Sequence, residues 1–324
     1  MSADTAKVET DDDGIRLDRW FKRHYPALSH GHLEKLLRTG QVRLDGKRAK
    51  AADRVAAGQS VRIPPQVVSA PAKEPKPAPS KMKLEDMVLY MDRSVIVLNK
   101  PAGLATQGGS GIGSNNVDAM LDQLAFERKQ RPRLVHRLDR DTSGVLVIAR
   151  TPSAAAALAR SLAQRDASKV YWALTRGVPK QKRGTIRAAL AKEGGRGAER
   201  MEVSESDDAK HAVTDYAVLD HAGDEFAWVA AKPVTGRTHQ IRVHLASLGT
   251  PIVGDFKYGG AAARGKGAIA DKLHLHARSI DIAHPDGGRL KAIAPLPPHM
   301  QKSWEFLGFN PGGETDPFAG RKKR

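Results

Sequence analysis

The sequence predicts an α+β protein whose main domain has a mixed, mainly antiparallel sheet and is preceded by a small α/β domain. Short apolar segments typical of strands are numerous after residue 84, and they do not alternate regularly with helices. A stretch rich in Pro, Ala, Ser and Lys at residues 65–83 is typical of a semi-extended linker. With 324 residues, the chain is long enough for one large domain and a smaller one.

The composition favours a polyanionic partner. The chain has 53 Lys and Arg against 36 Asp and Glu, a net charge of +17 and a pI near 10.1. This favours nucleic acid, although a merely basic enzyme would have the same composition. Cysteine is absent, which excludes disulfides, thiolate zinc sites and a cysteine nucleophile. The acidic start MSADTAKVETDDDG is the opposite of a secretory or transit peptide, so we expect a cytoplasmic protein.

We expect residues 1–13 to be a disordered acidic tail and residues 14–64 to form the small domain. Apolar residues at helical spacing, a capping serine and a terminating glycine predict two helices. The residues that carry this prediction are Leu17, Trp20, Phe21, Ser29, Leu33, Leu36, Leu37 and Gly40. A hairpin turning at Asp45 and Gly46 follows, and a last strand, SVRIP, comes after Gly58. Twelve Lys and Arg against four Asp and Glu give this unit a net charge of +8.

The larger domain is expected to span residues 84–308, followed by a basic tail at 309–324 whose RKKR end is expected to be disordered. Helices are predicted at 114–129 and 152–165. The predicted strands are VIVLN (95–99), GVLVIA (144–149), VYWALTRG (170–177), AVTDYAVLD (212–220), FAWVAAKPV (226–234), IRVHL (241–245) and SIDIAH (279–284).

Two segments flanked by predicted strands carry charge that core strands would exclude. RLVHRLDRDTSGVLVIAR (133–150) places Asp139 among cations, and VTGRTHQIRVHLASLGTPIVGD (234–255) again sets Arg and His beside apolar residues. One interpretation is structural, with the carboxylates neutralising Arg137 and Arg140 in a loop. The other is a shared cleft that holds a carboxylate and guanidinium groups, and the presence of two such clusters favours it slightly.

No metal and no cofactor are predicted. GAAARGK at 260–266 fits half of a P-loop, but Gly267 stands where Ser or Thr would hold Mg²⁺. Several histidines invite a metal site, yet nothing resembles a helical H-E-x-x-H pattern. We interpret them as histidines on a basic, RNA-facing sheet, especially His239, His244, His274 and His276.

Residues 14–64 resemble the S4 RNA-binding module. RLDRWF, RTGQV, LDGKRAK and GQSVRI match it in order, with His30 where that family usually has an arginine. The resemblance implies that the helices and the hairpin offer a basic surface to structured RNA. The candidate contacts on this surface are Arg16, Arg38, Lys47 and Arg48.

The larger domain resembles the RluA-type pseudouridine synthase family. The matching segments are VIVLNKPAGLATQGGSG, HRLDRDTSGVLVIAR, SKVYWALTRG, TGRTHQIRVH and LHLHARSIDIAHP, and with the S4 module the resemblance covers residues 14–305. The GGSG at 108–111 and the RDTSG ending are most similar to the ribosomal large-subunit group of the C type, which usually has His where this chain has Gln107. The resemblance implies a pseudouridine synthase fold and cofactor-free isomerisation of uridines in 23S rRNA.

The same resemblance implies roles for single residues. Asp139 matches the family nucleophile, Arg242 the arginine that pairs with it, and Tyr171 the tyrosine that packs on the flipped base. Arg137 matches the arginine that fills the space left by that base, because its flat guanidinium can stack on bases. Weaker candidates for phosphate or substrate contacts are Lys100, Arg237 and His239.

Two alternatives stay open from the sequence. One is a related synthase that acts on tRNA or at another ribosomal uridine, because target choice depends on RNA shape. The other is a non-catalytic ribosome-assembly factor that binds RNA. A binding module would not need Asp139, Tyr171 and Arg242 together, which argues against the second alternative. Nothing in the sequence demands more than a monomer.

Overall fold

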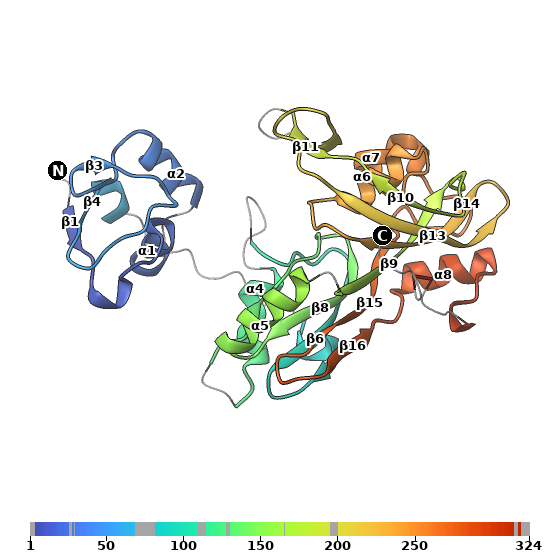
Figure 1. Cartoon of the computed structure of the whole chain (residues 1–324), viewed down its shortest axis with the longest axis horizontal. Coiled ribbons are helices and arrows are strands. Elements are labelled where there is room, and N and C mark those ends of the chain that lie inside the picture. Colours follow the sequence, from blue (N-terminus) through green and yellow to red (C-terminus); the bar gives the residue numbers. More distant parts are fainter. Residues whose placement is uncertain are drawn as a thin grey trace. The chain divides into compact units, whose positions relative to one another are not determined.

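The structure, a computed structural model, divides into two compact units, residues 1–79 and 80–324 (Figure 1). The first is a small α/β unit with its own sheet, and the second is an α+β unit built on a larger, mixed sheet that is mainly antiparallel. This arrangement confirms the predicted fold class. The residues that the structure describes are 4–25, 28, 30–68, 82–108, 115–127, 130–164, 166–194, 200–313 and 317–318.

The small unit has a four-stranded antiparallel sheet in the order β1-β4-β2-β3. Its strands are β1 (Asp4–Lys7), β2 (Arg43–Leu44), β3 (Lys47–Arg48) and β4 (Ser60–Ile63). Its helices are η1 (Thr10–Asp12, a 3-10 turn), α1 (Leu17–His24), α2 (His30–Arg38) and α3 (Pro65–Val68). Asp45 and Gly46 both have positive φ, which confirms the two-residue turn predicted between β2 and β3.

The core of the small unit confirms the helical spacing predicted for its first helix. Leu17, Trp20 and Phe21 are at most 1% exposed, and they pack against apolar residues of α2 and of the sheet. Val67 of α3 belongs to the same core. The folded unit therefore extends beyond its predicted boundary, into the first residues of the expected linker.

The expected disordered tail is wrong for residues 4–13. β1 pairs with β4 along its whole length, and the Asp12 carboxylate is buried. This carboxylate accepts a hydrogen bond from Arg23 Nη1 at 2.6 Å and lies 2.5 Å from His24 Nε2. An acidic stretch can fold here because the Arg23 guanidinium of α1 compensates the buried charge. Two predictions fall outside the described residues, the Ser29 helix cap and the linker at 69–81.

The described part of the large unit contains a ten-stranded sheet in the order β10-β13-β14-β9-β15-β8-β6-β5, with β16 pairing to β15 and β7 to β8. Its strands are β5 (Val88–Met91), β6 (Val95–Lys100), β7 (Arg133–Leu134), β8 (Ser143–Ala149), β9 (Ser168–Arg176), β10 (Arg183–Arg187), β13 (Val213–Ala222), β14 (Phe226–Pro233), β15 (Leu275–Ala283) and β16 (Arg289–Ile293). A separate hairpin consists of β11 (Leu190–Glu193) and β12 (Arg200–Val203). The α-helices are α4 (Val117–Met120), α5 (Pro152–Ala163), α6 (Gln240–Ser247), α7 (Phe256–Gly259) and α8 (Pro298–Leu307). The 3-10 turns are η2 (Glu85–Met87), η3 (Leu121–Leu124), η4 (Gly260–Ala263) and η5 (Pro311–Gly313).

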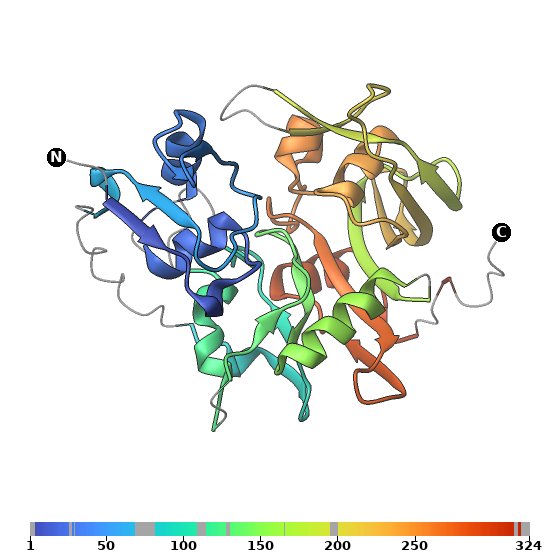
Figure 2. The ribbon, with the colours of Figure 1, turned by 60° about the vertical axis from the view of Figure 1, so that its left-hand side comes forward.

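Helices cover both faces of the sheet where β6 and β8 lie (Figures 1 and 2). Alternate residues of β6 point to opposite faces: Val95 and Val97 pack with α5, whereas Ile96 and Leu98 pack with α4 and η3. β8 is buried along its whole length. The charged loop that precedes β8 is therefore held at the end of a strand that is covered on both faces.

The helices in this part of the unit were predicted with mixed success. α5 confirms the helix expected at 152–165, and the Thr151 side chain caps it by accepting a hydrogen bond from Ala154 N at 3.1 Å. The helix expected at 114–129 is shorter, because the described residues there form only α4 and the tight turn η3. The Asn116 side chain caps α4 in the same way.

β8 and β15 run parallel, and Gly144 allows them to approach. The φ of this glycine is +107°, and a Cβ there would lie 2.2 Å from the carbonyl oxygen of Ala277. Any side chain would therefore push the two strands apart. Because the DRDTSG segment ends at this glycine, the close approach sets where the chain that carries Asp139 joins the sheet.

The strand predicted at 241–245 is wrong, because these residues form α6. The alternation of polar and apolar residues there mimics the period of a strand. In the helix every residue from 240 to 245 is buried, and the polar side chains have hydrogen-bond partners inside the fold. A helix without a solvated face has no helical period in its sequence, so the pattern could not reveal it.

The segment 309–324, which was expected to be a basic tail outside the domain, is partly folded. Phe309 and Phe318 are buried in an aromatic core with Trp228 and Trp304. These large rings anchor the chain after α8 against β9 and β14. Residues 319–324, which include the RKKR end, lie outside the described part of the chain.

Candidate active site

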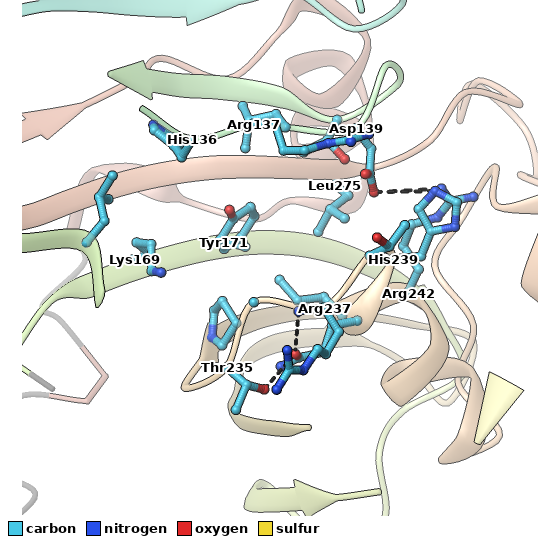
Figure 3. Close-up of a pocket in the computed structure, with 18 residues that line it drawn as sticks. His136, Arg137, Asp139, Lys169, Tyr171, Thr235, Arg237, His239, Arg242 and Leu275 are labelled. Atoms are coloured by element: carbon cyan, nitrogen blue, oxygen red, sulfur yellow. Dashed lines mark hydrogen bonds and ion pairs between the residues drawn. The ribbon is translucent and has the colours of Figure 1, made fainter. Parts of the chain in front are cut away.

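A cavity of about 300 Å³ opens between the two charged segments that the sequence singled out. One wall is the loop 136–142 that leads into β8, and the other is the segment 233–242 that leads from β14 into α6. The start of β9 forms the floor with Leu275 of β15 (Figure 3). The tertiary structure thus brings together two segments that are about a hundred residues apart in the chain.

Asp139 lies at the mouth of this cavity and is partly shielded from solvent. Its side chain is 22% exposed, and Oδ2 lies 3.7 Å from His239 Nε2 and 4.0 Å from Arg242 Nη1 (Figure 3). Both contacts are longer than a hydrogen bond. The carboxylate therefore faces two nitrogen groups while keeping its oxygens free to meet a substrate.

The backbone on both sides of Asp139 is held by one side chain at the end of β6 and one from the segment after it. Thr106 Oγ1 donates to Leu138 O at 2.7 Å and accepts from Leu138 N at 3.1 Å. Lys100 Nζ donates to Arg140 O at 3.0 Å, and to the carbonyl oxygens of Pro101 and Leu104 at 2.9 and 2.7 Å. These bonds fix the residues before and after Asp139, so the direction of its carboxylate is set by the fold.

The suggestion that Lys100 contacts RNA is wrong. The side chain is 0% exposed, and its three N–H groups are directed at three backbone carbonyls. Burial lowers the pKa of Lys100 to about 7. A lysine with this geometry shapes the loop that carries Asp139 and cannot reach a phosphate without leaving its site.

Arg242 has a closer carboxylate partner than Asp139. Its Nε and Nη2 donate to Asp255 Oδ2 and Oδ1, each at 2.7 Å. Asp255 is 1% exposed and follows Gly254, whose φ is +77° and where a Cβ would lie 2.0 Å from Lys272 O. Only glycine fits there, and this close approach places Asp255 beneath the guanidinium. The expected pairing of Arg242 with Asp139 is therefore one contact of a larger Asp255–Arg242–Asp139 arrangement.

Tyr171 lines the floor of the cavity, with Lys169 two residues earlier on the same face of β9 (Figure 3). Burial raises the pKa of Tyr171, and the nearby Asp139 charge adds to the increase. The hydroxyl is therefore protonated at neutral pH. Burial also lowers the pKa of Lys169.

The other cationic side chains that the sequence singled out are exposed to solvent. Arg137 and Arg237 are exposed and line the cavity, and Arg237 Nε donates to His211 O at 3.1 Å. Arg16 and Arg38 belong to the small unit, where both are exposed, and Arg16 pairs with Asp18 at 2.8 Å. The other candidates in that unit, also exposed, are Lys47 and Arg48 of β3.

The interpretation of the histidines as RNA-facing is wrong for three of them. His244, His274 and His276 are 0% exposed, and burial lowers the pKa of His274 and His276 to about 4. Their ring nitrogens have partners inside the fold, such as Ser143 Oγ at 2.8 Å from His276 Nδ1. Only His239 of the four lines the cavity. These histidines are neutral members of the core.

The described residues form neither a metal-binding cluster nor a membrane-spanning helix. They contain no group of three or more His, Cys, Asp or Glu side chains placed to hold a metal ion. Within the same ranges, no helix is both long enough and apolar enough to cross a membrane.

Comparison with known proteins decides the family. The chain matches the family described as RNA pseudouridylate synthase over residues 94–247. It is 34% identical to ribosomal large subunit pseudouridine synthase C of Vibrio cholerae over 310 residues, which are 91% of this chain and 95% of that protein. The chain belongs to the RluA-type RNA pseudouridine synthase family.

Two further relatives of this RNA pseudouridine synthase show how widely the likeness extends. RNA pseudouridine synthase 4, mitochondrial, of Arabidopsis thaliana is 33% identical, and the match covers 94% of this chain and 82% of that protein. The solved structure of human RNA Pseudouridylate Synthase Domain Containing 4 is similar with a TM-score of 0.59 and 29% identity, covering 69% of this chain and 94% of that one. The pseudouridine synthase fold implied by the sequence is thereby confirmed, and the protein is an isomerase that acts on RNA.

Several residues around the synthase cavity were missed by the sequence. Asp255 and Tyr258 lie beside Arg242 and His239, and Thr106 holds the loop before Asp139. Asp255 closes the second charged segment, TPIVGD, so its position was a usable signal. Nothing in the spacing could reveal that this carboxylate is buried or which cation it binds, because that depends on how α6 and α7 pack.

Proposed function

We propose that this protein converts specific uridines of 23S ribosomal RNA to pseudouridine. The observation that carries the proposal is the similarity to several proteins named ribosomal large subunit pseudouridine synthase C. Those of Vibrio cholerae, Pasteurella multocida and Salmonella typhi are 34%, 36% and 35% identical over 91–93% of this chain. The GGSG segment, which suggested this group from the sequence, lies largely outside the described residues.

We propose Asp139 as the nucleophile. In the reaction the N1–C1′ bond of the uridine breaks while Asp139 attacks the sugar or assists departure of the base. The uracil then turns, a C5–C1′ bond forms, the C5 proton leaves and N1 takes up a proton. Atoms and electrons therefore balance in this reaction without an oxidant, a reductant or a cofactor. A carboxylate at the mouth of a small cavity, beside a braced guanidinium, supports this role.

Two further residues have proposed roles toward the flipped nucleotide. Removing a base from its stack costs a few kcal/mol, which contacts in the cavity and in the vacated stack must offset. Arg137 is exposed at the rim and has a planar guanidinium that can occupy the vacated stack. The ring of Tyr171 forms part of the cavity floor, where it can pack against the uracil.

The experiment that tests the substrate is a map of pseudouridines across all rRNA and tRNA in cells that lack the protein. Loss of defined sites in 23S rRNA, restored by the wild-type gene but not by Asp139→Asn, is the expected result. Loss confined to tRNA would show that the substrate is tRNA and not 23S rRNA, as expected for a related synthase. A map without any loss would favour an RNA-binding assembly factor instead.

We propose that the small unit is an S4 module that binds RNA through its exposed cations. A test pairs Lys47→Ala/Arg48→Ala with the control Lys291→Ala/Lys302→Ala, which removes two exposed cations of the large unit. Each lost phosphate contact should reduce the slope of log affinity against log salt by about 0.7–0.9. The first variant should have a shallower slope for its rRNA fragment, and the control should not. Equal slopes would contradict RNA binding by β3.

The cellular location and the oligomeric state are part of the same proposal. We propose a cytoplasmic monomer, and the bacterial relatives that are named for the large ribosomal subunit support the cytoplasmic location. The Arabidopsis relative is named as mitochondrial, so the compartment is not common to all relatives. Fractionation of the native protein with ribosomal precursors tests the location directly.

A further inference from the structure

We propose that His239 is a positioning residue for Asp139, held by Tyr258 as the neutral tautomer that presents its Nε2–H to the carboxylate. The inference rests on the proposed role of Asp139 as the nucleophile. It gives His239 and Tyr258, both in the segment 234–258, a role in orienting the nucleophile.

The geometry places the His239 ring between a hydroxyl and the carboxylate. Nδ1 lies 2.5 Å from Tyr258 Oη, and Nε2 lies 3.7 Å from Asp139 Oδ2. The two rings meet edge to face with centroids 5.5 Å apart. Figure 3 shows His239 facing Asp139 across the mouth of the cavity. One imidazole nitrogen is thus occupied, and the other is directed at the nucleophile.

The proton positions follow from the partners of Tyr258. Its hydroxyl accepts a hydrogen bond from Met201 N at 3.3 Å, and burial raises the pKa of Tyr258, so the hydroxyl keeps its proton. His239 Nδ1, 2.5 Å away, is placed to accept that proton. Donation to Nδ1 makes it the unprotonated nitrogen, and the ring hydrogen must then be on Nε2.

Burial keeps the ring neutral, and the charged groups around it act in both directions. Asp139 and Asp255 favour the imidazolium, whereas Arg242 and Lys257 oppose it. Burial is the largest effect, and it lowers the pKa of His239. A second cation beside Arg242 would stabilise the carboxylate further and weaken it as a nucleophile, whereas a neutral donor orients it without adding charge.

The backbone of His239 also indicates a functional constraint. Its φ of +55° is left-handed, one of three such non-glycine residues in the described chain. Gln240 holds this turn: its Oε1 accepts from Thr235 Oγ1 at 2.7 Å and from Arg237 N at 3.0 Å. Strained conformations of this kind persist where surrounding bonds over-determine them, and they cluster at active sites. Here the turn directs the imidazole toward Asp139.

When a substrate binds, a small movement would bring His239 Nε2 within hydrogen-bond distance of Asp139. The Nε2–Oδ2 distance of 3.7 Å exceeds a hydrogen bond by less than about 1 Å. Hydrogen bonds of active sites are often long without substrate and tighten when it binds. Met201 belongs to β12, so the bond from its N–H to Tyr258 also links the β11–β12 hairpin to the nucleophile.

The decisive measurement is the tautomer of His239, read from its ring nitrogen shifts in the full-length protein labelled with ¹⁵N-histidine. Wild type should have a protonated Nε2 and an unprotonated Nδ1 around neutral pH. In Tyr258→Phe, the His239 ring should lose this tautomer preference and should become protonated at a higher pH. A protonated Nδ1 in wild type would overturn the proposal. This readout needs no catalysis, so it stands apart from a failure of Asp139→Asn to abolish activity.

Kinetics test the consequence for Asp139. Tyr258→Phe should lower kcat about tenfold with little change in KM for RNA, and its acid limb should move to higher pH. His239→Gln keeps an N–H near the position of Nε2 and should retain more activity than His239→Leu. Tyr90→Phe removes an exposed hydroxyl bonded to Asp92 and serves as the control that should behave as wild type. An unshifted pH profile in Tyr258→Phe, or equal activity of the two His239 variants, would contradict the positioning role.

Discussion

The Arg242 guanidinium is bound by Asp255 through two hydrogen bonds of 2.7 Å, whereas its third nitrogen lies 4.0 Å from Asp139. The two-point contact fixes the plane of the guanidinium, because the Nε and Nη2 groups on one edge both donate to the same carboxylate. Asp255 also shares the positive charge, so Arg242 presents Asp139 with a cation that is already partly neutralised. The position of this arginine therefore depends on a carboxylate that takes no direct part in the proposed chemistry.

Asp255→Asn should be destabilising and nearly inactive. The amide has almost the same size, but it leaves Arg242 buried without its main counter-ion, a change that costs about 3–5 kcal/mol. The released guanidinium should also shift toward Asp139, and a displacement of about 1 Å can cost about 100-fold in rate. Urea unfolding and pseudouridine formation measure the two effects. Asp208→Asn changes an exposed carboxylate of the same unit and should leave both unchanged.

Arg242→Lys should fail although it keeps the positive charge. A lysine ammonium is a point charge that cannot bridge Asp255 in two places and still face Asp139. We expect at least about a 100-fold loss in kcat, with RNA affinity within a few-fold of wild type. A lysine variant with near-normal kcat would mean that charge alone is required and that the fork geometry is incidental.

Lys100→Met should disturb the loop that carries Asp139. It leaves three backbone carbonyls without their donor, and each unsatisfied buried group costs about 1–3 kcal/mol. The variant should unfold at lower urea concentration and lose activity in proportion to the disorder of the loop. Lys302→Met, at an exposed position on α8, is the matched control. Full activity with normal stability would show that Thr106 alone is enough to hold the loop.

Tyr171→Phe separates packing from proton transfer. The raised pKa of Tyr171 means that a phenolate is not available at neutral pH, so the hydroxyl must pass on its own proton if it accepts one from C5. If it has this role, the phenylalanine variant should cleave the glycosidic bond but stall before the C5 proton is released. Tritium release from RNA containing 5-tritiated uridine measures that step. Near-normal release would leave the tyrosine with a packing role only.

Acid should destabilise the large unit through three histidines with lowered pKa values, of which His274 and His276 are buried and His136 is partly exposed at the cavity. Burial holds the pKa values of His136, His274 and His276 at about 4, below the ordinary 6.5. Their neutral forms favour the folded state, so this stability is complete above about pH 6.5 and is lost as the pH falls toward 4. Each histidine can contribute up to about 1.4 kcal/mol per pH unit in that window. Urea unfolding at pH 7 and pH 5 measures the loss, and His276→Gln should reduce it.

Equal free energies of unfolding at pH 7 and pH 5 would contradict the neutral assignment of these three rings. His221→Asn is the control, because it replaces an exposed histidine near the end of β13. It should keep the full pH dependence of the wild type.

Much of the fold could be predicted from the sequence for those helices and strands that have one side facing water. α1 and the hairpin at Asp45 and Gly46 follow from periodicity and turn chemistry, because solvent on one side imposes a pattern. β6, β8 and β9 were found as apolar runs. By contrast, α6 is buried all round, so its polar residues at every second position suggested a strand.

The site divides in the same way. The sequence by itself determined that Asp139 and Arg242 stand in charged segments unsuited to a core, and its resemblance to known synthases identified the chemistry. Only the tertiary structure decided that Arg242 is braced by Asp255, that Lys100 faces carbonyls and that the Tyr258 hydroxyl lies against His239 Nδ1. The physical reason is that residue type limits which bonds a side chain can make, whereas burial and partner are properties of the packed chain. Those properties depend on contacts between segments far apart in the sequence, which no local pattern encodes.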